Sequence, residues 1–179
     1  MRKYGVTISL ITCAIAGVFV VTAAQGDAEQ SAFSRTVIDL GVVVSDVEKA
    51  AHFYGEVLGF MEVGGFSVSG EMAAACGLTD HRPFMVRVFA AGKEPNATKL
   101  KIMEIPGSDS AKVNNTYIGS SLGFSYVTVF VSDLGATLDR CKSHQVTPVK
   151  RPYQLGGNNH LVVVKDPDGN NVELIGPMN

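Results

Sequence analysis

The chain has 179 residues, of which 46% are hydrophobic and 18% are charged, and its formal net charge is −2. These values are typical of one globular domain with an ordinary hydrophobic core. A nearly neutral charge without an arginine-rich run excludes the positive surface that nucleic-acid-binding proteins use. We therefore expect no nucleic-acid partner.

The first residues form a segment unlike the rest of the chain. Two positive charges in MRKY precede an uncharged apolar stretch over 5–24, and the polar stretch QGDAEQS follows. This order predicts a signal peptide over 1–24, cleaved near Ala23–Ala24, and then a flexible linker over 25–34. Because about 20 apolar residues also span a bilayer, a retained membrane anchor is the alternative. We favour export, and hence a periplasmic or secreted protein that contacts a membrane only if the segment is retained.

Two similar runs indicate an internal repeat. DLGVVVSD at 39–46 and YVTVFVSD at 126–133 both end in Val-Ser-Asp and are expected to be strands. Apolar residues recur at helical spacing after each run, over 47–60 and over 134–146. Ser45 followed by Glu48 predicts a capping box at the start of the first helix.

Three strand-like pieces follow each helix. In the first unit they lie at 60–68, 83–91 and 98–105, with a short helical or loop stretch at 70–78; in the second they lie at 147–155, 160–165 and 171–175. The DPDGN sequence predicts a tight turn between the last two strands. We therefore expect one domain over 35–177, with module one at 35–105, a polar connector at 106–121 and module two at 122–177.

Two cysteines fall within this domain, Cys76 and Cys141. An oxidising compartment would permit them to form a disulfide. Both lie in apolar helical contexts, where a free cysteine behaves as a small hydrophobic residue, and we favour two free thiols.

Strand side chains alternate between the two faces of a sheet, so the parity of a residue number sorts them. Leu40, Val42 and Val44 share one face and suit packing under a helix, whereas Asp39, Gly41 and Val43 share the other. In the second run, Val127 and the residues two and four positions after it share one face of the strand. Tyr126 opens the opposite face. A polar group thus opens the mixed face of each first strand.

The quoted motifs carry a family resemblance. Two βαβββ units, the A-x-F-Y-x-x-V-L-G-F helix at 51–60 and the K-D-P-D-G-N-N-V-E-L ending at 165–174 resemble the vicinal oxygen chelate superfamily of glyoxalase I, bleomycin-resistance proteins and extradiol dioxygenases. The resemblance implies an α+β fold in which curled mixed sheets form a cup. It also implies a small-molecule ligand or substrate and a possible homodimer.

The same resemblance implies four metal-ligand positions, on the first and last strands of the two units. Family members usually have His where this chain has Asp39 and Tyr126, and the last-strand positions are assigned to Glu104 and Glu173. Oxygen ligands of this kind favour Mg, Mn or Ca over Zn, Ni or Fe. The absence of both histidines makes a metal-free cup the other interpretation.

Two functional hypotheses follow from the resemblance. One is a glyoxalase I-like lyase or isomerase in which Glu173 or Glu104 moves the proton, and the other is a protein that binds or sequesters a small molecule without metal. Whether the chain is an enzyme is left open. His160 opens a late strand, and the sequence does not fix which face it occupies. The expected pocket walls are Val43, Ile102, Thr128, Phe130 and Ile175.

Overall fold

Two four-stranded mixed sheets with short helices confirm the predicted α+β fold of two βαβββ modules. The structure is a computed structural model that describes residues 32–179. The predicted signal peptide at 1–24 and the linker up to residue 31 lie outside the described residues. Within the part of the chain that is described, no helix has the length and apolar character needed to cross a bilayer.

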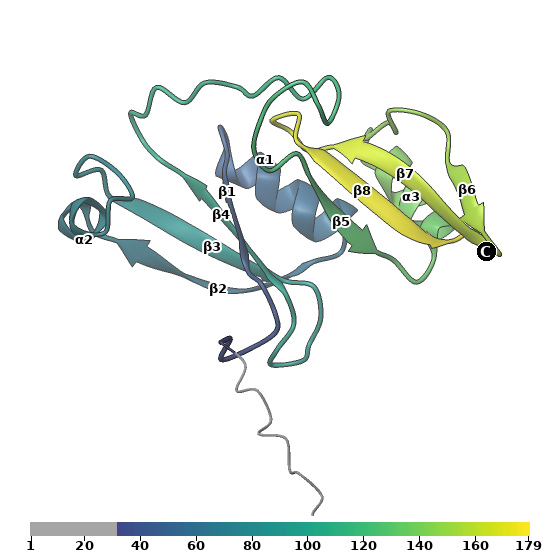
Figure 1. The fold of residues 1–179 in the computed structure, drawn as a ribbon, viewed down its shortest axis with the longest axis horizontal. Helices are drawn as coiled ribbons and strands as arrows, with labels where there is room; N and C mark the ends of the chain where they lie inside the picture. The colour runs from purple at the N-terminus through teal and green to yellow at the C-terminus, as the bar shows by residue number, and fades with distance from the viewer. Residues whose placement is uncertain (1–31) are drawn as a thin grey trace, which may run out of the picture. The chain divides into compact units, whose positions relative to one another are not determined.

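The first sheet has the strand order β1-β4-β3-β2 (Figure 1). Its strands are β1 (Leu40–Val43), β2 (Met61–Val68), β3 (Phe84–Ala90) and β4 (Lys99–Glu104). β1 runs parallel to β4, and the other neighbours are antiparallel. Parallel pairing of the first and last strands requires a crossover, which the intervening helix supplies.

The crossover helix consists of α1 (Val47–His52) and a π-helical turn, η1 (Phe53–Val57). The side chain of Asp46 caps α1 by accepting hydrogen bonds from the backbone N–H groups of the second and third helical residues. The predicted capping box at Ser45 is therefore wrong. Ser45 instead donates its hydroxyl to Asp168 at 2.5 Å, so its side chain is engaged elsewhere.

A second short helix, α2 (Gly70–Ala75), covers part of the face of the first sheet that points away from α1. Ala73 of α2 packs with buried side chains of β2 and β3 in a small cluster formed by Val68, Phe84 and Val86. This cluster leaves the β1 and β4 side of that face uncovered by a helix.

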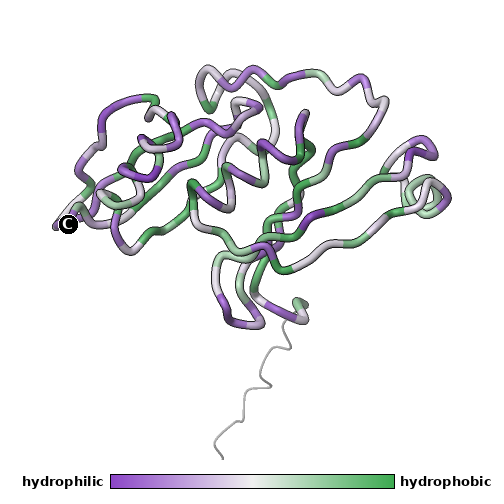
Figure 2. Tube along the Cα trace, turned by 180° about the vertical axis from the view of Figure 1, so that it is seen from behind, coloured by the Kyte–Doolittle hydropathy of each residue, from purple (hydrophilic) through white to green (hydrophobic). Residues whose placement is uncertain are grey.

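The second sheet repeats the arrangement with the order β5-β8-β7-β6. Its strands are β5 (Tyr126–Phe130), β6 (Tyr153–Gly156), β7 (Asn159–Lys165) and β8 (Asn171–Pro177), and α3 (Leu134–Ser143) is the crossover helix. β7 and β8 are antiparallel and joined at the predicted DPDGN turn. Figure 2 shows hydrophobic and hydrophilic residues alternating along the strands, as the parity argument requires.

One hydrophobic core joins the helix-covered faces of both sheets. It contains side chains from α1, η1 and α3 together with Ile102 of β4 and Leu174 of β8, both 0% exposed. Cys141 of α3 lies in this core, as expected, and Cys76 is exposed; both thiols are free. Each sheet turns its other face, here called the outer face, away from this core.

Two hydrogen-bonded contacts also connect the modules. The phenol of Tyr54 in η1 donates to Asp166 Oδ2 at 3.0 Å, in a buried position. Asp166 belongs to the turn between β7 and β8, and its other oxygen accepts two backbone N–H groups of that turn. The same turn supplies Asp168, which accepts from the backbone and side chain of Ser45. The turn motif of one module therefore anchors the start and middle of the helix segment of the other.

Candidate functional site

Strand register shows which residues of the two modules are equivalent. Gly41 of β1 lies opposite Lys101 of β4, and Thr128 of β5 lies opposite Glu173 of β8. Gly41 and Thr128 each come two residues after the polar residue that opens the strand run. Lys101 is therefore the counterpart of Glu173 in the first module.

The outer face of the first sheet carries an ion pair at this position. The Lys101 ammonium lies 3.1 Å from Asp39 Oδ2, and the Asp39 side chain is only 11% exposed. Because a nearly buried carboxylate needs a compensating charge, Lys101 gives Asp39 an electrostatic partner that a bound cation would otherwise supply.

The outer face of the second sheet carries a hydrogen-bonded pair instead. Thr128 Oγ1 donates to Glu173 Oε2 at 2.6 Å, a short distance typical of a charge-assisted hydrogen bond. Tyr126 shares this face and is 52% exposed. Glu173 keeps a second oxygen with which to accept a proton or a hydrogen bond from a ligand.

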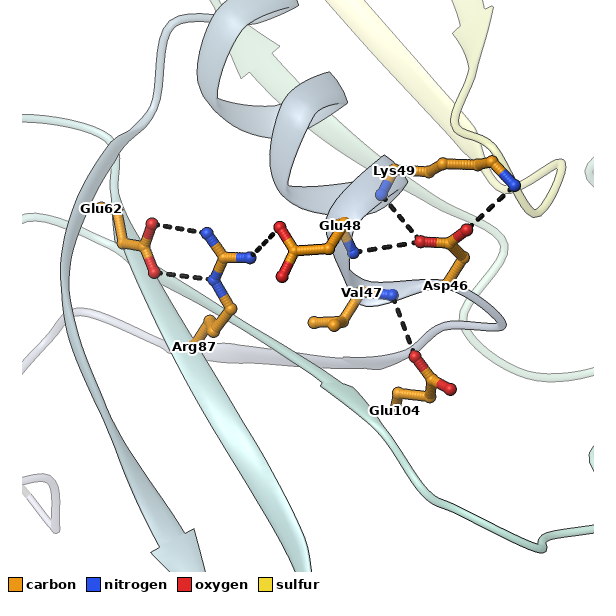
Figure 3. A network of polar contacts seen from close by, with 7 residues as sticks. All are labelled: Asp46, Val47, Glu48, Lys49, Glu62, Arg87 and Glu104. Carbon is orange, nitrogen blue, oxygen red and sulfur yellow. Dashed lines mark hydrogen bonds and ion pairs between the residues drawn. The ribbon is translucent and has the colours of Figure 1, made fainter.

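Glu104 does not lie on the outer face. It is three residues beyond Lys101, and an odd offset places it on the helix-covered side with Ile102. Its Oε2 accepts the backbone N–H of Val47 at 3.2 Å, at the start of α1 (Figure 3). This contact places a negative charge at a helix N-terminus, where it is favourable.

The predicted pocket walls divide in the same way. Val43, Thr128, Phe130 and Ile175 lie on the outer faces of the two sheets, and Phe130 is 78% exposed. Ile102 lies in the core on the helix-covered side of the first sheet and therefore lines neither outer face. His160 pairs in register with Gly176 and so shares the helix-covered side; its Nδ1 lies 3.0 Å from the Asn158 carbonyl oxygen. The histidine therefore does not join the outer face.

A single chain does not gather the four predicted ligands. A cavity of about 280 Å³ places Leu40, at the start of β1, beside Phe130, at the end of β5. Tyr126 begins β5 and lies about 13 Å further along that strand. Across residues 32–179, no three His, Cys, Asp or Glu side chains come close enough to hold a metal ion.

Comparison with known proteins identifies the family. The sequence model of the Glyoxalase/Bleomycin resistance protein/Dioxygenase superfamily matches residues 36–174. The chain belongs to this superfamily. The match confirms the resemblance carried by the helix and the DPDGN ending.

Individual relatives of the superfamily are distant. The chain is 28% identical over 170 residues to a lactoylglutathione lyase of Pseudomonas putida, covering 83% of this chain and 86% of that protein. A glyoxalase family protein of Bacillus cereus superposes with a TM-score of 0.69 at 16% identity, covering 84% of this chain and 99% of that one. The trypanothione-dependent glyoxalase I of Leishmania major gives 0.57 at 20% identity, covering 80% and 87%. These structural similarities support the superfamily fold.

The residues present do not fit a divalent metal at the positions that the superfamily resemblance implies. Register assigns those positions to Asp39, Lys101, Tyr126 and Glu173. A charged lysine has three donors and no lone pair, so it excludes a cation from its vicinity. Its ion pair also occupies one of the two remaining carboxylates. The donor set is therefore poorer than the three carboxylates expected from sequence.

Sequence reasoning missed Lys101, although a signal for it was present. The stretch LKIM at 100–103 aligns with VELI at 172–175, with apolar residues at every other position in common. In this alignment Lys101 matches Glu173. The metal-ligand position of the first module was assigned to the nearby Glu104 because a carboxylate is a common metal ligand.

Proposed function

We propose that the protein binds a small molecule on its outer sheet faces without a divalent metal at the superfamily's ligand positions. The observation that carries this proposal is the ion pair between Lys101 and Asp39. Lys101 occupies the position in the first module that is equivalent to Glu173 in the second. A fixed ammonium group supplies the positive charge that a metal ion would otherwise bring to that place.

The side chains on the two faces suggest the chemistry of the ligand. Lys101 suits an oxyanion, such as a carboxylate, and Glu173 suits a hydroxyl or amine that donates a hydrogen bond. Val43, Tyr126 and Phe130 add exposed apolar surface around them. We infer a ligand with an anionic or hydroxyl-bearing end and an apolar body.

We further propose that two copies of the chain complete the binding site. Each outer face carries only half of the polar groups, and large apolar side chains stand exposed on both, including Val43 at 47% and Phe130 at 78%. Exposed apolar residues gathered on one face are typical of interaction surfaces. A second copy that placed its second module against the first module of this one would bring Lys101 and Glu173 to one cavity.

The oligomeric state tests this arrangement. Sedimentation velocity of the full chain should show a dimer, and Phe130→Glu should convert it to a monomer without loss of secondary structure. Leu122→Glu is a matched control, because Leu122 is fully exposed in the loop that precedes β5. A monomeric wild-type chain, or a dimer unaffected by Phe130→Glu, would refute the shared site.

Ligand binding without metal is tested by thermal shift. A library of carboxylates and hydroxylated aromatic compounds is screened against the full chain in EDTA, and hits should raise the melting temperature. Lys101→Gln should reduce the affinity for such a hit at least tenfold, whereas Lys93→Gln, in an exposed loop, should not. The proposal fails if every hit requires added Mg²⁺, Mn²⁺ or Ca²⁺, or if no compound shifts the transition.

A lyase or isomerase activity is the second candidate, supported by the 28% identity to the Pseudomonas putida lactoylglutathione lyase. In this case Glu173, held by Thr128, would transfer the proton. Glu173→Gln should then lower the rate by about 10²–10⁴-fold. Lactoylglutathione lyase activity at the level of the blank, with and without added divalent metals, would exclude this activity and leave the binding proposal.

The N-terminal segment is the remaining part of the proposal. We propose that it directs export and is removed near Ala23–Ala24. N-terminal sequencing of the protein from a cell that secretes it should begin close to Gln25. Recovery of the uncleaved chain in the membrane fraction would instead establish the anchor.

A further inference from the structure

Two adjoining cavities form one groove at the contact between the modules, here called the junction groove. Their volumes are about 280 Å³ and about 460 Å³. Residues of both modules line the two cavities together: Phe60 and Ala91 from module one, and Val129 and Phe130 from β5 of module two. The groove therefore exists only because the two modules pack against each other.

The smaller cavity is the apolar end of the junction groove. The hydroxyl groups of Tyr54 and Thr128, which line it, donate to Asp166 and Glu173. Because these hydroxyls already have acceptors, this end suits an apolar group that needs no hydrogen bond. Most of the remaining wall consists of the apolar side chains of Leu40, Phe60, Leu100, Val127, Val129 and Phe130.

The larger cavity brings a cation to the other end of the junction groove. Arg140 of α3 lines this cavity, and two hydrogen bonds hold its guanidinium group. Nε donates to the carbonyl oxygen of Val57 in η1 at 3.3 Å, and Nη2 donates to Thr137 Oγ1 at 3.2 Å. Among residues 32–179, Nη1 has no hydrogen-bond partner. The guanidinium is a planar fork that matches a carboxylate, so its Nη1 end is available to bind one.

The charges along the junction groove also favour an anion. Lys99 lines the apolar cavity and Arg140 lines the larger one, so two cations border the groove. Asp133 is the one carboxylate among the described residues that line it, and its Oδ1 accepts the backbone N–H of Ala136 as the cap of α3. The positive N-terminal end of this helix offsets part of the charge of Asp133, which leaves an excess of positive charge in the groove.

We propose that the junction groove binds a small carboxylate with an apolar tail. The carboxylate accepts hydrogen bonds from the Nη1 end of Arg140, and the tail lies along the apolar walls of the smaller cavity. A purely polar anion would leave these walls in contact with water, and a neutral apolar molecule would leave the guanidinium group without its partner. Neither Lys101 nor Glu173 lines the groove, so this site goes beyond the proposed function and does not depend on it.

Calorimetric titration of octanoate into the full chain tests the site, and 1-octanol is the uncharged probe with the same tail. Octanoate should bind, and Arg140→Gln should weaken its binding about tenfold or more, because a charge-assisted hydrogen bond is lost. The same substitution should change the binding of 1-octanol less than twofold. Arg151→Gln, at an exposed position before β6, is the matched control and should leave the binding of both probes unchanged.

A second variant tests the place of binding. Ala91 is exposed and lines both cavities, so the larger side chain in Ala91→Phe should fill the groove and prevent binding of both probes. Ala75→Phe, at the exposed end of α2, should not affect either probe. Phe130 also borders the outer face of the second sheet, and for this reason it is left unchanged.

Lys101→Gln separates the junction groove from the outer faces. It should leave the Arg140-dependent binding of octanoate in place, whatever its effect on a ligand of the outer faces. The proposal is overturned if octanoate does not bind, if Arg140→Gln weakens octanoate and 1-octanol equally, or if Ala91→Phe leaves binding intact. Loss of octanoate binding in Lys101→Gln and not in Arg140→Gln would also overturn it.

Discussion

The buried hydrogen bond between Tyr54 and Asp166 gives the sharpest test of how the modules are held together. Asp166 is 4% exposed, and the Tyr54 phenol donates to its Oδ2. Asn170 Nδ2 also donates to this oxygen, at 2.9 Å. Tyr54→Phe removes the phenol oxygen alone and leaves the carboxylate with one donor fewer in a site that water does not reach.

The size of the effect follows from the charge of the acceptor. A hydrogen bond to a charged group contributes about 1.5–3 kcal/mol, compared with about 1 kcal/mol for a neutral pair. A domain of this size loses about 2–4 °C of melting temperature per kcal/mol. Tyr54→Phe should therefore lower the melting temperature by about 3–12 °C, measured by calorimetry at pH 7.

The pH dependence provides a second, independent readout. Burial, and next the charge of Asp166, raise the pKa of the Tyr54 phenol well above its ordinary value of 10.0. Above pH 10 the unfolded chain releases the phenol proton, whereas the folded chain retains it. The contribution of the hydrogen bond to stability is therefore complete below pH 10 and is lost as the pH rises. The stability difference between wild type and Tyr54→Phe should shrink by up to about 1.4 kcal/mol per pH unit above this point.

An exposed tyrosine supplies the control. Tyr153 is 72% exposed, and Tyr153→Phe should change the free energy of unfolding by less than about 0.5 kcal/mol. Urea titrations of both variants between pH 7 and pH 10.5 make the comparison. Equal effects of the two substitutions, or a difference that stays constant with pH, would refute the assigned hydrogen bond.

Three further predictions concern packing, thiol reactivity and charge. Gly176→Ala places a Cβ 2.3 Å from a backbone oxygen and should cost about 1–3 kcal/mol in urea unfolding, whereas Gly119→Ala meets no atom within 4 Å and should be neutral. Cys76→Ser should remove one fast-reacting thiol from a disulfide-exchange assay and Cys141→Ser none, because burial raises the pKa of the Cys141 thiol; the opposite order would contradict the burial. Arg87→Lys removes the guanidinium group that pairs with two glutamates and should lower the free energy of unfolding by about 1 kcal/mol. This loss should become smaller in high salt, and a loss independent of salt would argue against an electrostatic origin.

Local patterns in the sequence predicted much of the fold. The alternation in DLGVVVSD and YVTVFVSD placed Leu40 and Val127 on the helix-covered faces, because side chains of a strand alternate with a fixed period. The helical spacing after each strand identified α1 and α3, and the DPDGN turn fixed the last hairpin. These signals depend only on neighbours along the chain.

Other predictions needed the partner of each strand or helix. The sequence pattern predicted Ser45 as the helix cap. In the structure its hydroxyl donates to Asp168 in a turn of the other module, and Asp46 caps the helix instead. Glu104 looked like a ligand, but its parity relative to Lys101 sends it to the start of α1. Strand register and hydrogen bonds across the modules decide such cases.

The sequence by itself determined the repeat, the two βαβββ modules and the alternation that gives each sheet one apolar and one mixed face, because periodicity is a local property of the chain. Only the tertiary structure decided that Lys101 stands opposite Gly41, and that His52 and His144 meet. Both follow from pairing between residues far apart in sequence, which the shared core fixes and which no local pattern encodes.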